Sequence, residues 1–123
     1  MPAVVDSSIL IAAFDREDPR RGQARSLLGR HGQIEVPVEV LGETLGVVHR
    51  RRSFATAMQL WTQLQAIPSL VFSQRSDLGA VAAVFAEAKG ELTWVDAAVV
   101  ARSRAGGLVA LAFDRAIQRR SAA

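Results

Sequence analysis

The chain has 123 residues, of which 50% are hydrophobic and 22% charged, with a formal net charge of +3. This length is typical of one domain, so we expect a single domain over residues 1–123, and the composition argues against wholesale disorder. The absence of cysteine excludes disulfide scaffolds, thiolate zinc sites and cysteine nucleophiles. The first ten residues lack the basic segment of a signal peptide, and no apolar run approaches the roughly 20 residues that span a bilayer. We therefore expect a cytoplasmic protein that does not contact membranes.

The basic residues are almost all arginine, because Lys89 is the only lysine among the 15 basic residues. The planar guanidinium of arginine suits phosphate groups, so the composition is compatible with a nucleic-acid partner. The alternative is that genomic base composition favours arginine codons. The bias alone does not decide between the two.

Short apolar runs alternate along the chain with segments of helical periodicity. Strands are expected at 3–5, 34–36, 70–72 and 108–113. The intervening helices are expected after Ser7 or Ser8, from Asp18-Pro19, after Pro37, after Ser53, over 78–89, over 93–105, and after Asp114. Strands separated by helices predict an α/β protein with a parallel sheet covered on both faces.

Four acidic residues stand at positions where such a fold brings distant segments together. Asp6 and Asp114 follow the first and last predicted strands, so both lie at the same edge of a parallel sheet. Asp96 falls in the first turn of a helix, and Glu43 lies within an otherwise apolar helical stretch. Each has an ordinary alternative, since the aspartates suit helix N-termini and Glu43 has Arg50 and Arg51 as possible ion-pair partners.

Convergence of the four would require cations. Two carboxylates about 5 Å apart repel by roughly 3 kcal/mol at an effective dielectric near 20, so four of them need metal ions or protons. Carboxylate oxygens prefer Mg²⁺, with Mn²⁺ as the alternative. Mg²⁺ in an acidic cleft of a basic protein suits the hydrolysis of a phosphodiester backbone.

These segments resemble the PIN domain family of metal-dependent ribonucleases, and more narrowly the toxins of VapBC toxin–antitoxin pairs. The resemblance covers nearly the whole chain. It rests on four segments in order: Val4–Leu10 with Asp6, Pro37–Leu45 with Glu43 rather than Glu39, Leu92–Ala101 with Asp96, and Leu111–Arg115 with Asp114. Each segment is weak evidence by itself, and their order and spacing make the likeness specific.

The resemblance implies a three-layer αβα fold and an Mg²⁺-dependent endoribonuclease that cuts structured RNA of the tRNA or rRNA class. It implies that Asp6, Glu43, Asp96 and Asp114 are the catalytic and metal-binding residues, with Asp6 and Asp96 as the more direct ligands. It also implies that Ser7 or Ser8 forms hydrogen bonds within the site. The expected partners are RNA, a cognate antitoxin and a second copy of the chain in a homodimer.

Two matters stay open at the level of sequence. The alternative function is a non-catalytic PIN-like module that binds RNA or protein, although a binder has no need to gather four like charges. The arginines that contact RNA cannot be chosen from the sequence. The candidates are Arg16, Arg20, Arg21, Arg50, Arg51, Arg52, Arg102, Arg104 and Arg115.

Overall fold

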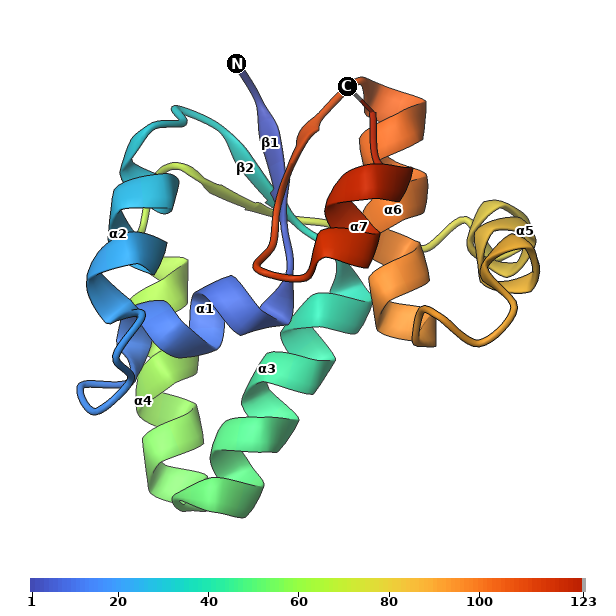
Figure 1. The fold of residues 1–123 in the computed structure, drawn as a ribbon. Coiled ribbons are helices and arrows are strands. Elements are labelled where there is room, and N and C mark those ends of the chain that lie inside the picture. Colours follow the sequence, from blue (N-terminus) through green and yellow to red (C-terminus); the bar gives the residue numbers. More distant parts are fainter. Residues whose placement is uncertain (123) are drawn as a thin grey trace.

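The computed structural model describes residues 1–122 and contains one parallel sheet (Figure 1). Its strands are short: β1 (Ala3–Val5), β2 (Ile34–Val36), β3 (Leu70–Phe72) and β4 (Val109–Leu111). Their order in the sheet is β3-β2-β1-β4. All three pairings are parallel, with Val4 opposite Glu35 and Val5 opposite Leu111.

The strand order reverses between β1 and β4. From β1 the chain adds β2 and then β3 on one side, and it returns to place β4 on the other side of β1. In open α/β sheets, ligands bind outside the carboxyl ends of the strands at such a reversal. The backbone N–H of Asp6 donates to the carbonyl of Leu111 at 2.9 Å, which joins the ends of β1 and β4 at that point.

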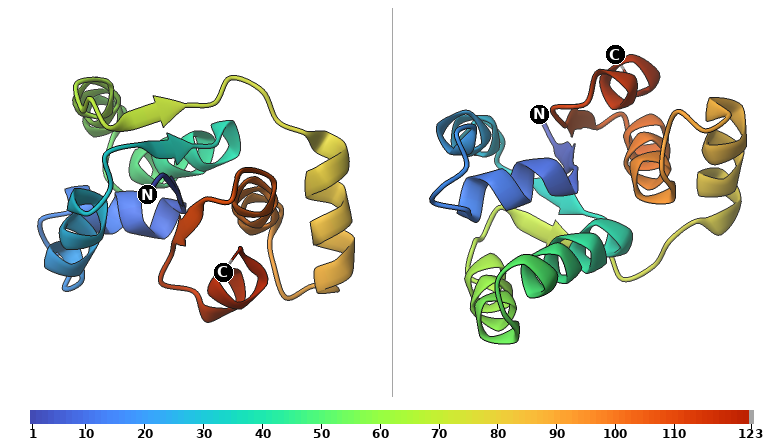
Figure 2. Two further views of the ribbon diagram at one scale, coloured as in Figure 1. Left: turned by 90° about the horizontal axis from the view of Figure 1, so that it is seen from above. Right: turned by 60° about the horizontal axis from the view of Figure 1, so that its bottom comes forward.

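Seven helices are present within residues 1–122, and they lie on both faces of the sheet (Figures 1 and 2). Their bounds are α1 (Ser7–Phe14), α2 (Arg21–Gly29), α3 (Val38–Arg51), α4 (Phe54–Gln65), α5 (Leu78–Ala88), α6 (Trp94–Gly106) and α7 (Arg115–Arg120). Helices α1 and α2 lie side by side on one side of the sheet, while α6 packs on β1 and β4 from the other. This is the predicted αβα arrangement. None of these helices is long and apolar enough to cross a bilayer.

The core lies between the sheet and the helices on either face. Val4, Val5, Ile9 and Val99 are completely buried. The apolar character of β1 follows from its central place, because both of its faces are covered. These buried contacts fix the ends of β1 and the start of α1, where the first of the four acids lies.

The structure corrects three boundaries. The apolar run 108–113 was expected to be one strand, but β4 ends at Leu111 because Leu111 already faces Val5, the last residue of β1. The helix expected from Asp18 begins at Arg21, because the Asp18 carboxylate accepts a hydrogen bond from the Arg20 backbone N–H at 2.7 Å and forms a turn. The first helix is capped by Asp6 rather than by Ser7 or Ser8.

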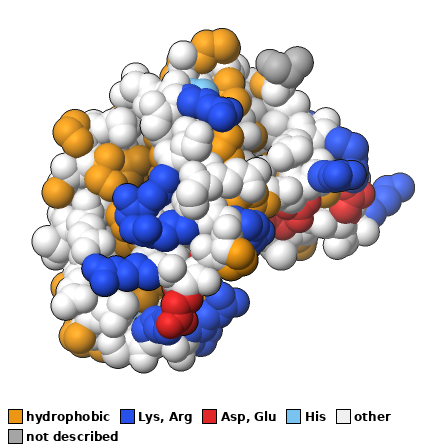
Figure 3. Space-filling view, turned by 60° about the vertical axis from the view of Figure 1, so that its left-hand side comes forward, with side chains coloured by type: hydrophobic (Ala, Val, Ile, Leu, Met, Phe, Trp, Pro, Cys, Tyr) orange, Lys and Arg blue, Asp and Glu red, His pale blue; other side chains and the backbone are white. Residues whose placement is uncertain are grey.

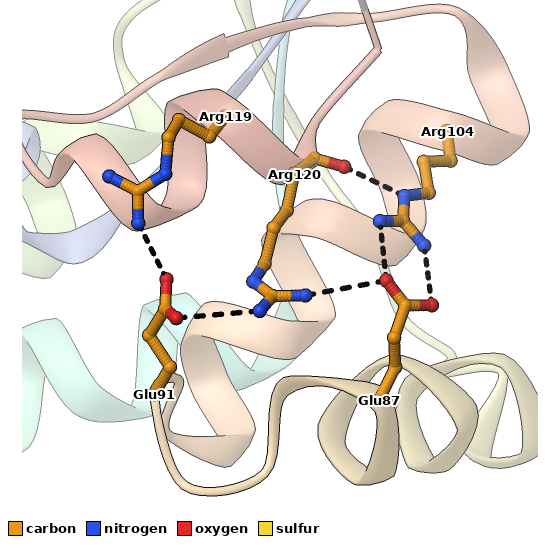
Figure 4. Close-up of polar contacts among 5 residues, drawn as sticks. All are labelled: Glu87, Glu91, Arg104, Arg119 and Arg120. Atoms are coloured by element: carbon orange, nitrogen blue, oxygen red, sulfur yellow. Dashed lines mark hydrogen bonds and ion pairs between the residues drawn. The ribbon is translucent and has the colours of Figure 1, made fainter.

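A cluster of ion pairs holds α7 against α5 and α6 (Figure 4). Arg104 of α6 pairs with Glu87 of α5 at 3.1 Å, and Arg120 of α7 reaches both Glu87 and Glu91 at 3.4 Å. Arg119 pairs with Glu91 at 2.7 Å. The cluster lies on the surface, and it anchors the short helix that begins directly after Asp114.

Candidate functional site

Asp6 is the most buried of the four predicted site residues, with 4% of its surface exposed. It follows β1 directly and is the N-cap of α1. Its Oδ2 accepts hydrogen bonds from the Ser8 backbone N–H at 3.3 Å and from the Ser8 hydroxyl at 2.7 Å. Its Oδ1 is buried and has no hydrogen-bond partner within residues 1–122. A buried oxygen without a partner is costly, so this atom is suited to a ligand.

Asp114 occupies the equivalent place after β4. It is the N-cap of α7, and its Oδ1 accepts a hydrogen bond from the Ala116 backbone N–H at 2.7 Å. Unlike Asp6, it is exposed. The ion-pair cluster of Figure 4 holds α7 from its other end, so the position of Asp114 is set by both β4 and α7.

Asp96 lies in the first turn of α6, half-buried, where it forms a capping box with Thr93. The Thr93 hydroxyl accepts from the Asp96 backbone N–H at 3.1 Å, and Asp96 Oδ2 accepts from the Thr93 backbone N–H at 2.9 Å. This reciprocal pair satisfies two backbone donors at the helix start. It also fixes the direction in which the Asp96 carboxylate lies.

Glu43 lies in the middle of α3, and its Oε1 accepts a hydrogen bond from the Ser7 hydroxyl. Helix α3 packs against both α1 and α6, which brings Glu43 beside the segments that carry Asp6 and Asp96. The sequence left open an ion pair of Glu43 with Arg50 or Arg51, and no such ion pair is present within residues 1–122. The expected hydrogen bonds of Ser7 and Ser8 within the site are both present.

All four acids line one open cavity of about 520 Å³ at the β1/β4 end of the sheet. Within residues 1–122, none of the four forms an ion pair with an arginine, lysine or histidine. Other residues that line this cavity, which we call the acidic pocket, are Ser7, Ser8, Ile11, Asp18, Arg20, Val47, Arg51 and Phe113.

The sequence analysis did not single out Asp18 or Phe113 as site residues, nor choose Arg20 among the arginines. Asp18 and Arg20 belong to the loop between α1 and α2, and Phe113 precedes Asp114. The Arg20 guanidinium lies 4.4 Å from the centre of the Phe113 ring and 3.6 Å from Asp18 Oδ1. The one available signal was the position of Phe113 beside an acid at a strand end, and nothing in the loop sequence indicates which way it folds.

The surroundings of Asp6 in the acidic pocket shift the pKa of its carboxyl. Burial raises the pKa of the Asp6 carboxyl above its ordinary value, and the negative charge of Asp96 raises that pKa further. The hydrogen bonds from Ser8 act in the opposite direction and lower the pKa of Asp6, without cancelling the effect of burial. Asp6 therefore lies close enough to Asp96 for their charges to repel, in a place from which water is largely excluded.

The donor set fits a hard divalent cation. Each of the four carboxylates uses one oxygen for a hydrogen bond and, within the described part of the chain, makes none with the other. As the side chains lie, no three acidic or histidine residues among positions 1–122 are close enough to hold one ion together. The free oxygens are Asp6 Oδ1, Glu43 Oε2, Asp96 Oδ1 and Asp114 Oδ2, so binding of one ion by three of them would require side-chain rotation.

Comparison with known proteins gives a family and two similar folds. The PIN domain family profile matches residues 3–123. The crystal structure of Mycobacterium tuberculosis VapC20, described as a sarcin–ricin loop cleaving toxin, has a TM-score of 0.80 and 22% identity over 95% of this chain and 93% of that one. Rickettsia felis VapBC2, bound to a DNA fragment from its promoter, has a TM-score of 0.72 and 13% identity over 97% of this chain and 92% of that one. The search of curated proteins gave no match.

Proposed function

This chain belongs to the PIN domain family, and on that premise we propose that it is an Mg²⁺-dependent endoribonuclease, the VapC-type toxin of a type II toxin–antitoxin pair. The observation that carries the proposal is the acidic pocket, in which four carboxylates from four separate segments line one cavity and, among the described residues, none forms an ion pair. Like charges that are gathered in one pocket repel one another, which costs the folded state free energy. Their convergence is therefore best explained by a cation that they bind.

We propose that Asp6, Glu43, Asp96 and Asp114 hold the metal ion, with Asp6 and Asp96 as its more direct ligands. Asp6 Oδ1, which has no hydrogen-bond partner in the described part of the chain, supports this role, as does the repulsion between Asp6 and Asp96. A bound Mg²⁺ lowers the pKa of an attacking water and stabilises charge that develops on the phosphate. Mn²⁺ is the alternative ion, because it accepts the same oxygen ligands.

The chain's own residues orient these carboxylates. Ser8 holds one oxygen of Asp6, and Ser7 holds one oxygen of Glu43. Because each serine uses only one oxygen of its partner, the second stays available. Hydrogen bonds of this kind fix the direction of a ligand and tune its affinity.

The proposed substrate is structured RNA of the tRNA or rRNA class. The likeness in fold to a toxin that cleaves the sarcin–ricin loop supports this class, and so does the net charge of +3. The proposed location is the cytoplasm, where such RNA is found.

The proposed partners are a cognate antitoxin and a second copy of the chain in a homodimer. The likeness in fold to VapBC2 supports an antitoxin. A groove of about 370 Å³ between α1, α3 and α4 shares Ile11, Val47 and Arg51 with the acidic pocket. A peptide segment in this groove would have direct access to the carboxylates.

The test is RNA cleavage by the purified chain in MgCl₂ and in EDTA. Asp96→Asn should lose activity by more than the roughly 10–100-fold that substitution of an outer-shell residue costs, while its amide oxygen still accepts from the Thr93 N–H. Asp77→Asn is the matched control, because Asp77 caps α5 through the Ala80 N–H and lies outside the acidic pocket. RNA that is bound but not cut, with Mg²⁺ or Mn²⁺, would favour the non-catalytic module instead.

A further inference from the structure

Two arginines line the acidic pocket, Arg20 on the α1–α2 loop and Arg51 in the last turn of α3. Arg20 is the more firmly placed of the two. Its guanidinium stacks on Phe113 at 4.4 Å and lies 3.6 Å from Asp18, and the Asp18 carboxylate also accepts the Arg20 backbone N–H at 2.7 Å. A side chain held in this way loses little conformational entropy when it binds a ligand.

Arg20 nevertheless keeps its hydrogen-bonding capacity. Its side chain is 51% exposed, and none of its guanidinium N–H groups makes a hydrogen bond to any residue among positions 1–122. A guanidinium has five donors in a planar fork that matches two oxygens of a phosphate. The contact with the Phe113 ring positions the guanidinium without using any of these donors in a hydrogen bond.

Within residues 1–122, Arg20 forms no ion pair with any of the four carboxylates. Its only ion pair with a described residue is with Asp18. Asp18 is therefore better explained as the anchor of Arg20 than as a fifth metal ligand.

We propose that Arg20 is a phosphate-binding residue, which holds a backbone phosphate of the RNA beside the scissile phosphate at the mouth of the acidic pocket. This inference rests on the proposed function. An RNA strand that enters a pocket of four carboxylates meets strong repulsion, and cations at the rim offset it. Arg20 supplies such a cation on the side of the pocket formed by Phe113.

The surface near Arg20 carries further arginines. Arg16, Arg25 and Arg30 are exposed on the α1–α2 loop and on α2. The space-filling view of this side of the molecule shows basic side chains prevailing over acidic ones (Figure 3). Such a surface attracts the RNA backbone independently of RNA sequence. Arg20 lies where this basic surface meets the acidic pocket.

The experiment uses an RNA oligonucleotide that spans the site cut by the wild-type chain, labelled for binding and for cleavage. Arg20→Ala should raise KM about tenfold and leave kcat within about twofold, since the contact is made equally in the ground and transition states. In the uncut complex with the Asp96→Asn chain, Arg20→Ala should lower the slope of log Kd against log salt concentration by about 0.7–0.9, the value for one phosphate contact. Arg20→Lys should restore the slope but only part of the affinity, because lysine keeps the charge and loses the fork and the stack.

Arg50→Ala is the matched control, because Arg50 is exposed, adjoins Arg51 and lies outside the acidic pocket. It should leave KM and the salt slope near those of the wild type. Equal effects of Arg20→Ala and Arg50→Ala would overturn the assignment, as would an Arg20→Ala chain with unchanged salt slope. A wild-type chain that cuts no RNA would refute the proposed function itself, and the assignment of Arg20 with it.

Discussion

Asp6→Asn separates the folding role of Asp6 from its proposed role in metal binding. Asparagine is as good an N-cap as aspartate, so its amide oxygen should still accept from the Ser8 N–H. The substitution removes a buried charge whose pKa is raised by burial and by Asp96. Because burial disfavours a charged carboxylate more than a neutral amide, we expect the variant in EDTA to be more stable than the wild type.

Magnesium should make the wild type more stable than Asp6→Asn. An ion that binds only the folded chain stabilises it by RT ln(1 + [L]/Kd), which is about 1.4 kcal/mol when the ion is at about ten times Kd. For a domain of this size that corresponds to a rise in Tm of about 4–7 °C. The wild type should show this rise in MgCl₂, and Asp6→Asn should show little of it.

The effect of pH has a definite sign. A carboxyl whose pKa is raised by folding binds its proton more tightly in the folded chain, so the stability that this proton provides is lost as pH rises through the folded pKa. In EDTA, the stability of the wild type should therefore fall relative to Asp6→Asn as pH rises above about 4, the ordinary pKa of an aspartate.

Thermal unfolding followed by circular dichroism, in EDTA and in MgCl₂, measures these differences. Asp77→Asn is the control, because it changes an aspartate N-cap outside the acidic pocket and should keep the response to Mg²⁺. If Asp6→Asn is less stable than the wild type in EDTA, or gains as much from Mg²⁺, the reasoning about Asp6 is wrong.

Two further predictions concern the supports of the site. Ser7→Ala should lower RNA cleavage by roughly tenfold with the fold retained, because Glu43 loses the donor that orients it. Ser76→Ala removes a similar hydrogen bond outside the acidic pocket, and this control should leave cleavage unchanged. Glu87→Gln should lower Tm in low salt, and the difference should vanish in about 1 M NaCl, because its ion pairs with Arg104 lie on the surface. The pKa of Glu87 is lowered by Arg104, so the stability that the Glu87 carboxylate gives is present above about pH 4.5 and is lost as pH falls through its folded pKa. A Tm difference between Glu87→Gln and the wild type that persists in high salt would contradict this account.

The sequence was sufficient where a local rule decided the structure. The alternation of apolar strands with helices predicted the parallel sheet. The common location of Asp6 and Asp114 then follows, because the carboxyl ends of parallel strands lie at one edge of the sheet. The start of a helix after Ser53 was also predicted from residue type alone. Identification of Glu43 needed the family resemblance as well, because a glutamate within a helix has no local signal.

The sequence was insufficient where contacts between distant residues decided the structure. The guanidinium of Arg20 meets Phe113, 93 positions later in the chain, through the conformation of a loop that residue types do not fix. The last residue of β4 and the first residue of α2 were predicted incorrectly for a related reason. The end of a strand depends on its neighbour, and the start of a helix depends on which side chain closes the turn before it.

Three of the four acids lie at the starts of helices, and this explains how one pocket tolerates them. Asp6 begins α1, Asp96 lies in the first turn of α6, and Asp114 begins α7. Backbone N–H groups and the helix dipole favour a negative charge there by about 0.3–1 kcal/mol each, and each of these acids takes one N–H with one oxygen. Substitution to alanine would therefore remove a cap together with a ligand and confuse stability with activity. Substitution to asparagine keeps the cap, so any loss of RNA cleavage that it causes belongs to the second oxygen and its charge.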